Sequence, residues 1–496
     1  MKKVLVTLVV LPALIGTQIV AANAAVMTFT QLFGGSQGDF ARGIFVDSNH
    51  IYIVGETGSF GPNTPNLFLS IFRLDNSHKC SVAVDLGYSE RGMKVVAYGG
   101  NVYAIGDTIG DLLLVKFDTD CNVLRAAVYN IDRKSGLPSG LSISPEGSTL
   151  FITGIFVTEF TRMGETIRAE PGDYLLAVRT SDLSVAWAKL FKVAGAGITA
   201  SSVTFSGNKL YVTGWTSTDD LFISRFDAAT GNHELTKVFS TSQSEAGTDI
   251  VVTGGKVYVV GTYRDPNPNK LSEILFMRLD TNLNLELAKT FGTPSFEYGA
   301  SLSMVGGLAY VVAWTNVFGT PDTALFAVNP MTGDISHAFV LRNDTAYHLT
   351  FDSTSTGTCL IYTGGSAEWP LFYAALDSVT SGTISFTTSS PPPLITIPSL
   401  TPSFPTPTAT RFTPAFNTPS GGGDAFYSRF CPDALTVSTT ITSTGSVLTK
   451  LTLTTTLTQY FAEPITSYLM LVLLAVVAAL LAALLVVGRR RKLPSG

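Results

Sequence analysis

The sequence predicts an all-β protein that repeats one four-stranded antiparallel unit seven times, and three observations lead to this. A short phrase of the kind Gly-Lys-Val-Tyr-Val-Val-Gly recurs at intervals of about 50 residues. Each copy alternates apolar and polar residues and is rich in Val, Ile and Tyr, as half-buried strands are. A second phrase, of eight residues, follows every copy. The first phrase is centred on Tyr52, Tyr103, Phe151, Tyr211, Tyr258 and Tyr310, with a weaker copy that begins at Cys359.

Each repeat supplies four strands in a fixed order. An apolar segment before the recurring phrase forms the first strand, the phrase itself the second, and the eight-residue phrase the third. The third strand usually ends in Asp or Asn, which suits a tight turn. A fourth strand follows, as at residues 233–240 and 285–292. The third strands are expected at residues 68–75, 111–118, 173–180, 220–227, 273–280, 322–329 and 370–377.

Seven such units have one economical packing. A single four-stranded sheet exposes an apolar face, whereas sheets stacked around an axis bury these faces against one another, and closing the ring removes the open ends. The sequence therefore predicts a seven-bladed β-propeller over residues 25–388. The seventh unit runs out after its third strand, and a spare strand precedes the first unit. We expect Thr28–Phe33 to lie beside the third strand near Phe372 and to close the ring.

A family resemblance supports the same fold. The stretch FGGSQGDFARGIFVDSNHIYIVGETGSF (Phe33–Phe60) resembles the SBBP β-propeller repeat of secreted prokaryotic proteins. The matching features are the Gly-Gly pair, the acid, Ile-x-Val-Asp, Tyr-x-x-Gly and Thr-x-Ser-Phe. Later units keep this frame but drift, and the third lacks the acid. The resemblance covers residues 28–388 and implies the architecture, without implying a particular activity.

Both ends of the chain carry membrane-targeting signals. Residues 1–24 combine a basic start, an apolar stretch and an Ala-Asn-Ala cleavage site, as a secretory signal peptide does; an uncleaved anchor is the alternative. Residues 465–488 are apolar and long enough to cross a bilayer as one helix. The basic tail 489–496 is then expected in the cytoplasm. A buried core helix, or a sorting signal that is exchanged for a lipid, are the alternatives for this end.

Residues 389–464 are expected to form a disordered stalk that lifts the propeller off the membrane. The stretch Ser389–Pro414 is dense in proline, which favours an extended polyproline II chain over packed structure. Gly421–Gly423 adds a hinge. Residues 435–459 alternate Thr with Val, Ile and Leu, so they are either strand-like or an extended segment that carries O-linked sugars.

Two columns of acidic residues are the main candidate binding groups. One column lies five residues before the first apolar position of the first strand in five units, and the other opens the third strand in five units. Both columns are expected on the same face of a propeller, where an acidic collar would attract cations or a basic partner. Alternatively, each acid hydrogen-bonds its own turn and recurs because the repeat recurs. The columns are Asp39, Glu90, Glu245, Glu297 and Asp344, and Asp111, Asp173, Asp220, Glu273 and Asp322.

The loops on that face differ in length, which makes it the expected recognition surface. The longest is Ile155–Gly172. Trp215, Trp314 and Trp369 lie at or near related positions of their units. They are candidates to stack on sugars or to contact a protein, and the alternative is that they pack between blades. Asn343, in the sequon Asn-Asp-Thr, is the candidate glycosylation site.

Several function classes lack support. Charged residues make up 14% of the chain, its net charge is −5, and no basic patch indicates nucleic-acid binding. The five His residues show no metal-ligand spacing and no loop resembles a calcium site, so no metal or cofactor is predicted. No G-x-S-x-G or H-E-x-x-H motif assigns a catalytic residue. Cys80 and Cys121 are expected to be unpaired, because outer turns of adjacent blades usually lie farther apart than the ~7 Å a disulfide spans.

The sequence thus favours a cell-surface protein with an extracellular body, held in the membrane by one helix. Its propeller is expected to act as a binding or adhesion module toward an unknown extracellular protein or glycan, through the loop-rich face. One rival is an extracellular propeller enzyme, a hydrolase or lyase on polymers, whose catalytic groups come from separate blades. The other is a structural component of the cell envelope, which a broad apolar patch on the blade sides would favour.

Overall fold

A computed structural model describes residues 26–455 of the 496-residue chain, apart from short internal stretches. Those stretches are 64, 131–135, 157–158, 163–164, 169–172, 194–196, 265–271, 294, 317–321, 342–344, 355–356, 367–372, 376–379, 384, 386, 390–392, 397–405, 407, 413–414, 417–423, 432–436 and 445–446. The chain divides into two compact units. One is Thr30–Arg429, and the other combines Met1–Phe29 with Phe430–Gly496.

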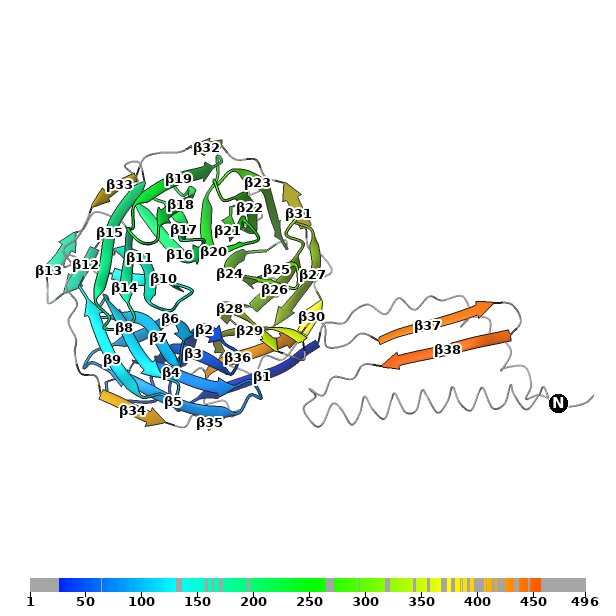
Figure 1. The fold of residues 1–496 in the computed structure, drawn as a ribbon, viewed down its shortest axis with the longest axis horizontal. Helices are drawn as coiled ribbons and strands as arrows, with labels where there is room; N and C mark the ends of the chain where they lie inside the picture. The colour runs from blue at the N-terminus through cyan, green and yellow to red at the C-terminus, as the bar shows by residue number, and fades with distance from the viewer. Residues whose placement is uncertain are drawn as a thin grey trace, which may run out of the picture. The chain divides into compact units, whose positions relative to one another are not determined.

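The larger unit contains seven antiparallel sheets of four or five strands, numbered here in chain order (Figure 1). The first strands are β2 (Asp39–Val46), β6 (Glu90–Tyr98), β10 (Gly136–Ile143), β16 (Ile198–Ser206), β20 (Glu245–Thr253), β24 (Glu297–Val305) and β28 (Thr345–Thr354). The second strands are β3 (His50–Thr57), β7 (Asn101–Thr108), β11 (Thr149–Phe156), β17 (Lys209–Thr216), β21 (Lys256–Tyr263), β25 (Leu308–Thr315) and β29 (Gly357–Ser366).

In the first six sheets the third and fourth strands also follow in chain order, as the repeat predicts. The third strands are β4 (Asn66–Arg73), β8 (Asp111–Asp118), β14 (Asp173–Arg179), β18 (Leu221–Asp227), β22 (Glu273–Asp280) and β26 (Asp322–Val328). The fourth strands are β5 (His78–Asp85), β9 (Val123–Tyr129), β15 (Val185–Val193), β19 (His233–Ser240), β23 (Leu285–Gly292) and β27 (Ile335–Leu341). A small separate hairpin, β12 (Glu159–Arg162) with β13 (Glu165–Arg168), lies within the predicted long loop.

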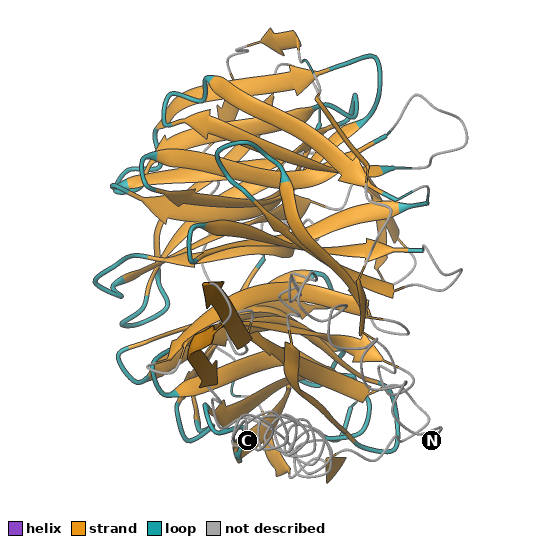
Figure 2. Cartoon of the chain, turned by 90° about the vertical axis from the view of Figure 1, so that its right-hand side faces the viewer, coloured by secondary structure: helices purple, strands orange, loops and turns teal. Residues whose placement is uncertain are grey.

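The first strands surround the centre of the ring. Each contacts the first strand of the next sheet, in the order β2, β6, β10, β16, β20, β24 and β28, and β28 contacts β2 again. Figure 1 shows these strands nearest the centre and the later strands progressively farther out. From the side, Figure 2 shows strands throughout, connected by loops and turns at their ends. Four-stranded antiparallel sheets repeated around a central axis are the arrangement of a β-propeller.

The apolar core lies between neighbouring sheets, because successive residues of a strand point to opposite faces. In β21, Tyr258 and Val260 belong to the cluster shared with the sixth sheet. Val257 and Val259 of the same strand belong to the cluster shared with the fourth sheet. Both faces of the recurring phrase are therefore buried, so it is a continuous apolar run and not the half-buried, alternating strand that the sequence predicts.

A bulge explains the glycine that ends the recurring phrase. Each first strand has a register shift opposite this position, for example between Gly92 and Lys94 in β6. A Cβ atom on Gly106 would lie 1.8 Å from the Arg91 carbonyl oxygen of the first strand, and one on Gly261 would lie 1.9 Å from the Ala246 oxygen. Glycine is needed because the bulged backbone passes too close for a side chain. The sixth sheet departs from this pattern with Ala313.

The seventh sheet closes with the N-terminal strand, but its third strand is not the predicted one. The order in this sheet is β28, β29, β36 (Asp424–Cys431), β1 (Val26–Gly34) and β35 (Ala415–Phe416). The predicted clasp by Thr28–Phe33 therefore occurs in the expected sheet. Its neighbour there is β36, some fifty residues beyond the predicted strand near Phe372, which itself lies outside the described residues.

The segment after β29 supplies fifth strands around the outside of the ring (Figure 1). They are β30 (Tyr373–Ala375) on the sixth sheet, β31 (Thr380–Thr383) on the fifth, β32 (Thr387–Ser389) on the fourth, β33 (Pro393–Thr396) on the third, β34 (Thr408–Phe412) on the first and β35 on the seventh. We call this set the outer belt. All six strands pair antiparallel with their neighbours.

The outer belt corrects two expectations from the sequence. The phrase at residues 370–377 contributes β30, a fifth strand beside β27, and not the third strand of the seventh sheet. Much of the expected stalk, residues 389–464, also belongs to the sheets, since β33, β34, β35 and β36 all pair there. A proline-containing segment can pair in this way, because the solvent-facing edge of an outermost strand needs no N–H donors.

The smaller unit contains a hairpin of β37 (Val437–Thr444) and β38 (Val447–Thr455), which selects the strand-like alternative for these residues. The expected signal peptide 1–24, membrane helix 465–488 and basic tail 489–496 lie outside the described residues. Within the described part of the chain, no helix is long and apolar enough to span a membrane.

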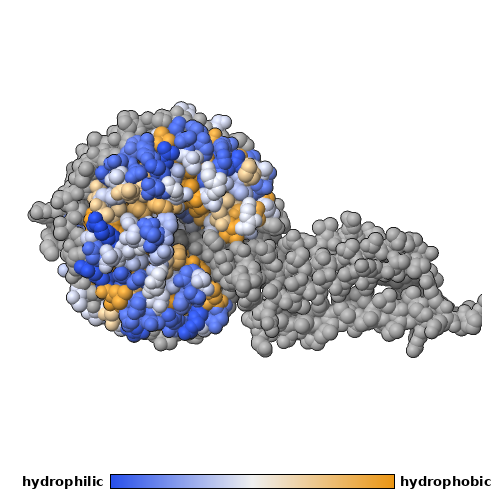
Figure 3. Space-filling view, viewed as in Figure 1, coloured by the Kyte–Doolittle hydropathy of each residue, from blue (hydrophilic) through white to orange (hydrophobic). Residues whose placement is uncertain are grey.

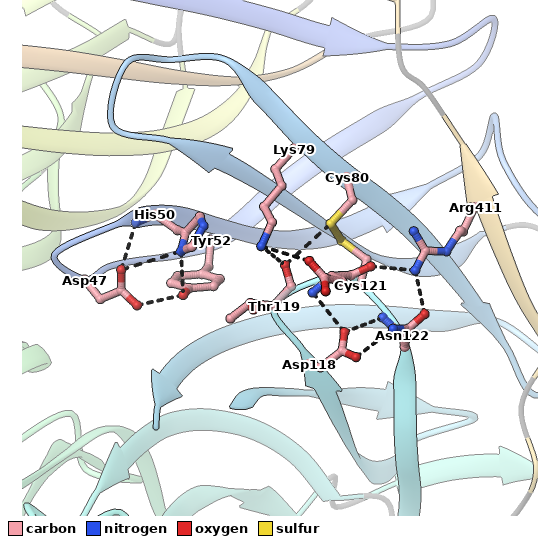
Figure 4. Close-up of polar contacts among 11 residues, drawn as sticks. Asp47, His50, Tyr52, Lys79, Cys80, Asp118, Thr119, Cys121, Asn122 and Arg411 are labelled. Atoms are coloured by element: carbon pink, nitrogen blue, oxygen red, sulfur yellow. Dashed lines mark hydrogen bonds and ion pairs between the residues drawn. A yellow bond between two sulfur atoms is a disulfide. The ribbon is translucent and has the colours of Figure 1, made fainter. Parts of the chain in front are cut away.

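The junction of the first two sheets corrects the expectation for the cysteines (Figure 4). Cys80, in β5, and Cys121, in the turn between β8 and β9, form a disulfide with Cα atoms 6.1 Å apart. The two cysteines meet because the turn between β8 and β9 contacts β5, the fourth strand of the preceding sheet. Lys79 Nζ donates to the Thr119 carbonyl in the same turn at 2.6 Å, and Arg411 of β34 donates to the Asp120 carbonyl at 2.5 Å.

The same kind of contact recurs between later sheets. A side-chain donor on one sheet reaches a carbonyl in or beside the third-to-fourth-strand turn of the next. Lys116 Nζ donates to the Thr180 oxygen at 3.0 Å, Trp187 Nε1 to Ala228 at 3.1 Å, Arg225 Nη1 to Thr281 at 2.5 Å and Arg278 Nη1 to Pro330 at 2.8 Å. These bonds link sheets two to six on the face opposite the acid columns.

Candidate functional site

The acid columns lie at the strand ends where the sequence places them, but most of their side chains are buried. Seven of the predicted acids have relative exposures of 6% or less: Asp39, Glu90, Asp173, Glu245, Glu273, Glu297 and Asp322. Asp111 and Asp220 are half-buried, and Asp344 lies outside the described residues. These positions do not form an exposed acidic collar.

The buried acids of the first column bond to threonine hydroxyls nearby. The Thr108 hydroxyl donates to Glu90 at 3.0 Å, and the Thr315 hydroxyl donates to Glu297 at 3.2 Å. Asp39 accepts in the same way from Thr57. Each of these threonines faces the acid across the first and second strands. The arrangement matches the alternative in which each acid serves its own repeat.

The backbone of the same column joins adjacent sheets. The Glu90 N–H donates to the Pro65 carbonyl at 3.0 Å, and the Glu245 N–H donates to the Asp219 carbonyl at 2.7 Å. The Glu297 N–H likewise donates to Ser272 at 3.2 Å. Each acceptor lies one or two residues before the third strand of the preceding sheet. The column therefore ties neighbouring sheets together.

Burial also reduces the negative charge of this column. It raises the pKa of Glu245 and of Glu297 to about 7, and it raises the pKa of Glu90 as well. Burial raises the pKa of Asp173, in the second column, well above its usual range. A carboxyl group in a poorly solvated site favours its neutral form. Glu245 and Glu297 are therefore partly protonated at neutral pH and attract cations weakly.

Two of the predicted tryptophans occupy equivalent places near the same face. Trp215 and Trp314 stand one residue before the end of β17 and β25, and both are half-buried. The Trp314 ring lies 6.1 Å from the ring of Tyr298, which faces it on β24. Trp369 lies outside the described residues. Trp187, which the sequence did not single out, bonds between sheets on the opposite face.

Trp215 and Trp314 belong to a level of the ring where the first and second strands carry half-buried side chains. We call the described pairs at this level the mouth ring. In each pair, the first-strand residue comes directly after the position of the first acid column, and the first strands surround the centre of the ring. All of its members are half-buried except Asp107, which is buried. The pairs are Phe40 with Glu56, Arg91 with Asp107, Leu137 with Ile155, Thr199 with Trp215, Ala246 with Thr262, and Tyr298 with Trp314.

Charge gathers on one side of the mouth ring. Arg91 donates from Nε and Nη2 to the two carboxylate oxygens of Asp107, each at 3.0 Å. This bidentate pair is a strong, oriented contact. The bond to Asp107 raises the pKa of Arg91, and Glu56 of the first sheet adds to the effect. Glu56 itself pairs with Arg42. The first two sheets thus present alternating charges.

Aromatic and neutral side chains occupy the other side. Thr199, Trp215, Thr262, Tyr298 and Trp314 come from the fourth, fifth and sixth sheets. The Thr262 hydroxyl is buried, and no group in the described part of the chain bonds to it. On the face that Figure 3 turns to the viewer, hydrophobic patches are small and set among hydrophilic residues. The mouth ring therefore joins a charged half to an aromatic half.

A second polar level lies deeper, directly after the bulge of each first strand. We call these seven positions the bulge ring. They are Gly43, Lys94, Gly140, Ser202, Asp249, Ser301 and His348. None of them was among the site residues predicted from the sequence. The signal was present, because each one directly precedes the apolar residue at the middle of its first strand, and aligning the seven repeats there would have shown a column rich in polar residues.

Asp249 connects three sheets within the bulge ring. Its Oδ1 accepts from the Ser202 hydroxyl at 2.7 Å and from the Ile250 N–H at 2.9 Å. Its Oδ2 accepts from the Ser301 hydroxyl and the Leu302 N–H, both at 2.9 Å. These four bonds use the acceptor capacity of the carboxylate. In the described residues, no group of three or more His, Cys, Asp or Glu side chains is arranged to hold a metal ion.

The fold and its two polar rings define a β-propeller-like protein. No family model matches the sequence, and no curated protein matches it either. The expected SBBP resemblance is therefore not supported by a family match.

Solved structures do resemble this chain. A quinohemoprotein alcohol dehydrogenase of Pseudomonas putida HK5 is 12% identical, with a TM-score of 0.42 over 70% of this chain and 73% of that protein. A Pyrococcus horikoshii acylaminoacyl peptidase is 11% identical, with a TM-score of 0.41 over 72% and 53%. A Mycobacterium tuberculosis puromycin-hydrolyzing peptidase is 13% identical, with a TM-score of 0.42 over 69% and 53%. This chain spans about half the length of each peptidase. At these identities and TM-scores, no residue, substrate or activity transfers to it.

Proposed function

We propose that this protein is a seven-bladed, closed β-propeller of the SBBP repeat type that is displayed outside the cell. The signal peptide 1–24, the membrane helix 465–488 and the cytoplasmic tail 489–496 are part of this proposal. The Cys80–Cys121 disulfide supports export, because disulfides persist mainly in oxidising compartments. Glycosylation at Asn343 belongs to the same proposal.

The propeller acts as a binding module, and the ligand is an extracellular protein or glycan that contacts the mouth ring. The observation that carries this is the composition of one level of the ring. Half-buried aromatic side chains stand on one side and two arginine–carboxylate pairs on the other. Aromatic rings with a polar neighbour and oriented charged groups are the combination that ligand sites use. The buried acid columns have a structural role.

A glycan and cell-wall polymer binding screen with the full chain tests this. Trp314→Ala and Arg91→Ala are compared with Trp187→Ala, which removes a tryptophan on the opposite face. Binding that falls at least tenfold in the first two variants and persists in the control supports the mouth ring as the site. Binding that is unchanged in both mouth variants places the site elsewhere on the protein.

A second candidate is an extracellular propeller enzyme, and a specific observation favours it. Two acids with two arginines gather at the mouth, and Lys94, Ser202, Asp249 and Ser301 stand at one deeper level. Catalytic groups from separate blades are the form such an enzyme would take. Release of soluble fragments from any polymer bound in the screen, lost in Lys94→Met, would support this candidate over simple binding.

A further inference from the structure

The bulge ring contains one charged group without a bonded partner. Lys94 follows the bulge of β6 and is half-buried. Among the described residues, no hydrogen bond or ion pair reaches its Nζ. On the first sheet, a Cβ on Gly43 would lie 2.8 Å from the Lys94 Cα, so the two first strands approach closely at this level. On the third sheet the equivalent residue is Gly140, which has no side chain to pair with the ammonium.

Lys94 acts across the centre of the ring. The attraction of Asp249, on β20, raises the pKa of Lys94. Around the circle of first strands, β10 and β16 lie between β6, which carries Lys94, and β20. An interaction between strands so placed passes through the interior. Burial lowers the pKa of Lys94, and the attraction of Asp249 only partly offsets this. A partly desolvated ammonium group without a bonded partner favours its neutral form.

Asp249 is not available as that partner. Its two oxygens already accept four hydrogen bonds from the Ser202 and Ser301 hydroxyls and from two backbone N–H groups. Its place in the ring is therefore fixed by the fourth and sixth sheets. Ser202 and Ser301 donate their hydroxyl protons to Asp249, so neither serine bonds to Lys94. Lys94 is therefore the charged group at this level that has no bonded partner among the described residues.

We propose that the bulge ring is a binding site for an anionic group, a carboxylate or phosphate of a small ligand, with Lys94 as its charged partner. The two glycines beside Lys94 leave its ammonium as the only charged side chain on that side of the ring among the described residues. The site lies deeper than the mouth ring, and the proposal stands without the function proposed above. It explains why a lysine occupies a level where neighbouring sheets carry glycine or serine.

The test measures the pKa of Lys94 in the full chain labelled with 13C at lysine Cε, with Lys94→Met to assign the signal. Sodium phosphate and sodium acetate are the two probes, used in separate arms at constant ionic strength. A bound anion favours the charged form, so the pKa of Lys94 is expected to rise by about 1 unit or more. A response to phosphate alone or to acetate alone identifies the kind of ligand group.

A thermal shift measurement on variants makes the result independent of the label. The probe that raises the pKa should also raise the melting temperature of the wild type and of Lys94→Arg, and should leave Lys94→Met unchanged. Lys256→Met is the matched control, because this lysine pairs with Glu286 at the surface. The proposal is overturned if neither probe moves the pKa of Lys94, or if Lys94→Met responds like the wild type.

Discussion

A glutamate that is buried at the start of a first strand gains hydrogen bonds and loses water. Glu297 is fully buried and accepts from the hydroxyls of Thr293 and Thr315. Its other carboxylate oxygen has no hydrogen-bond partner among the described residues. Two hydroxyl donors do not replace the solvation of a carboxylate, so the neutral form is favoured. In the folded protein this side chain is therefore held most stably in its protonated form.

This predicts a pH dependence of stability with a definite sign. The pKa of Glu245 and of Glu297 is about 7 in the folded protein, whereas an unfolded glutamate titrates near pH ~4.3. Between these values the folded state holds a proton that the unfolded state releases. The free energy of unfolding should therefore fall by about 1.4 kcal/mol per pH unit for each group as the pH rises from about 4.5 to 7.

Urea unfolding at pH 5 and pH 7.5 measures the effect. Glu297→Gln cannot ionise, so it should lose less stability than the wild type over this range. Glu286→Gln is the control, because the hydrogen bond from Lys256 lowers the pKa of Glu286 and places its titration below the range. An equal loss of stability in Glu297→Gln and the wild type would show that Glu297 is ionised throughout.

At the scale of the strand, one glycine in the recurring phrase sets how closely the first and second strands approach. A Cβ on Gly106 would lie 1.8 Å from the Arg91 oxygen, whereas one on Gly99, in the preceding turn, would meet no atom within 4 Å. Gly99 has a φ of 56°, so alanine there is strained but has room. The two positions separate a steric cost from a conformational cost within one hairpin.

We expect Gly106→Ala to destabilise the protein by about 3 kcal/mol, since the bulged strand must move to admit the methyl group. Gly99→Ala should cost about 1 kcal/mol, the price of a left-handed residue with a side chain. Chemical denaturation of the two variants gives both values. Equal losses would mean that the bulge yields easily and that the close approach does not require glycine.

At the scale of the whole molecule, the ring is joined at two places by contacts between distant parts of the chain. The seventh sheet combines β1 from the start of the body with β36 from near its end. The first and second sheets are joined covalently by Cys80–Cys121 and further by Arg411 of the outer belt. Neither junction is a contact between strands that are adjacent in sequence.

Truncation tests the first junction. A fragment of residues 25–388 lacks β36 and three strands of the outer belt, β33, β34 and β35. In this fragment β1 has neither of the strands beside which it lies in the seventh sheet. We expect it to be aggregated or to unfold at a much lower temperature than a fragment of residues 25–431, which retains every strand of the seven sheets. Circular dichroism melting and size-exclusion chromatography compare them. Equal melting temperatures would mean that the seventh sheet closes without β36.

Reduction tests the second junction. The disulfide closes a loop with a sequence separation of 41 residues, for which the chain-entropy relation gives a stabilisation of about 4 kcal/mol. A reducing agent should lower the melting temperature of the wild type. It should not affect the Cys80→Ala/Cys121→Ala variant, which should melt at the temperature of the reduced wild type. A wild type that melts at the same temperature with and without reductant would contradict this.

The repeated unit of this protein could be predicted from its amino-acid sequence alone. The recurring phrase, the eight-residue frame after it and the spare N-terminal strand predicted four-stranded sheets and a strand that returns to the last one. These features are local, because strand periodicity and turn residues depend on near neighbours along the chain. For the same reason the positions of the acid columns and of Trp215 and Trp314 could be read from the repeat.

The outer strands, the disulfide, the burial of the acids and the bulge ring depend on contacts between residues far apart in sequence, so they could not be predicted before the chain was seen folded. Composition could not show that a proline-rich segment pairs as outermost strands, where missing N–H donors do no harm. Spacing could not show that Cys121 leans over Cys80, or that the acids are buried between sheets. The bulge ring arises only when seven first strands meet around one centre, which brings Lys94 and Asp249 to the same level although they are more than 150 residues apart.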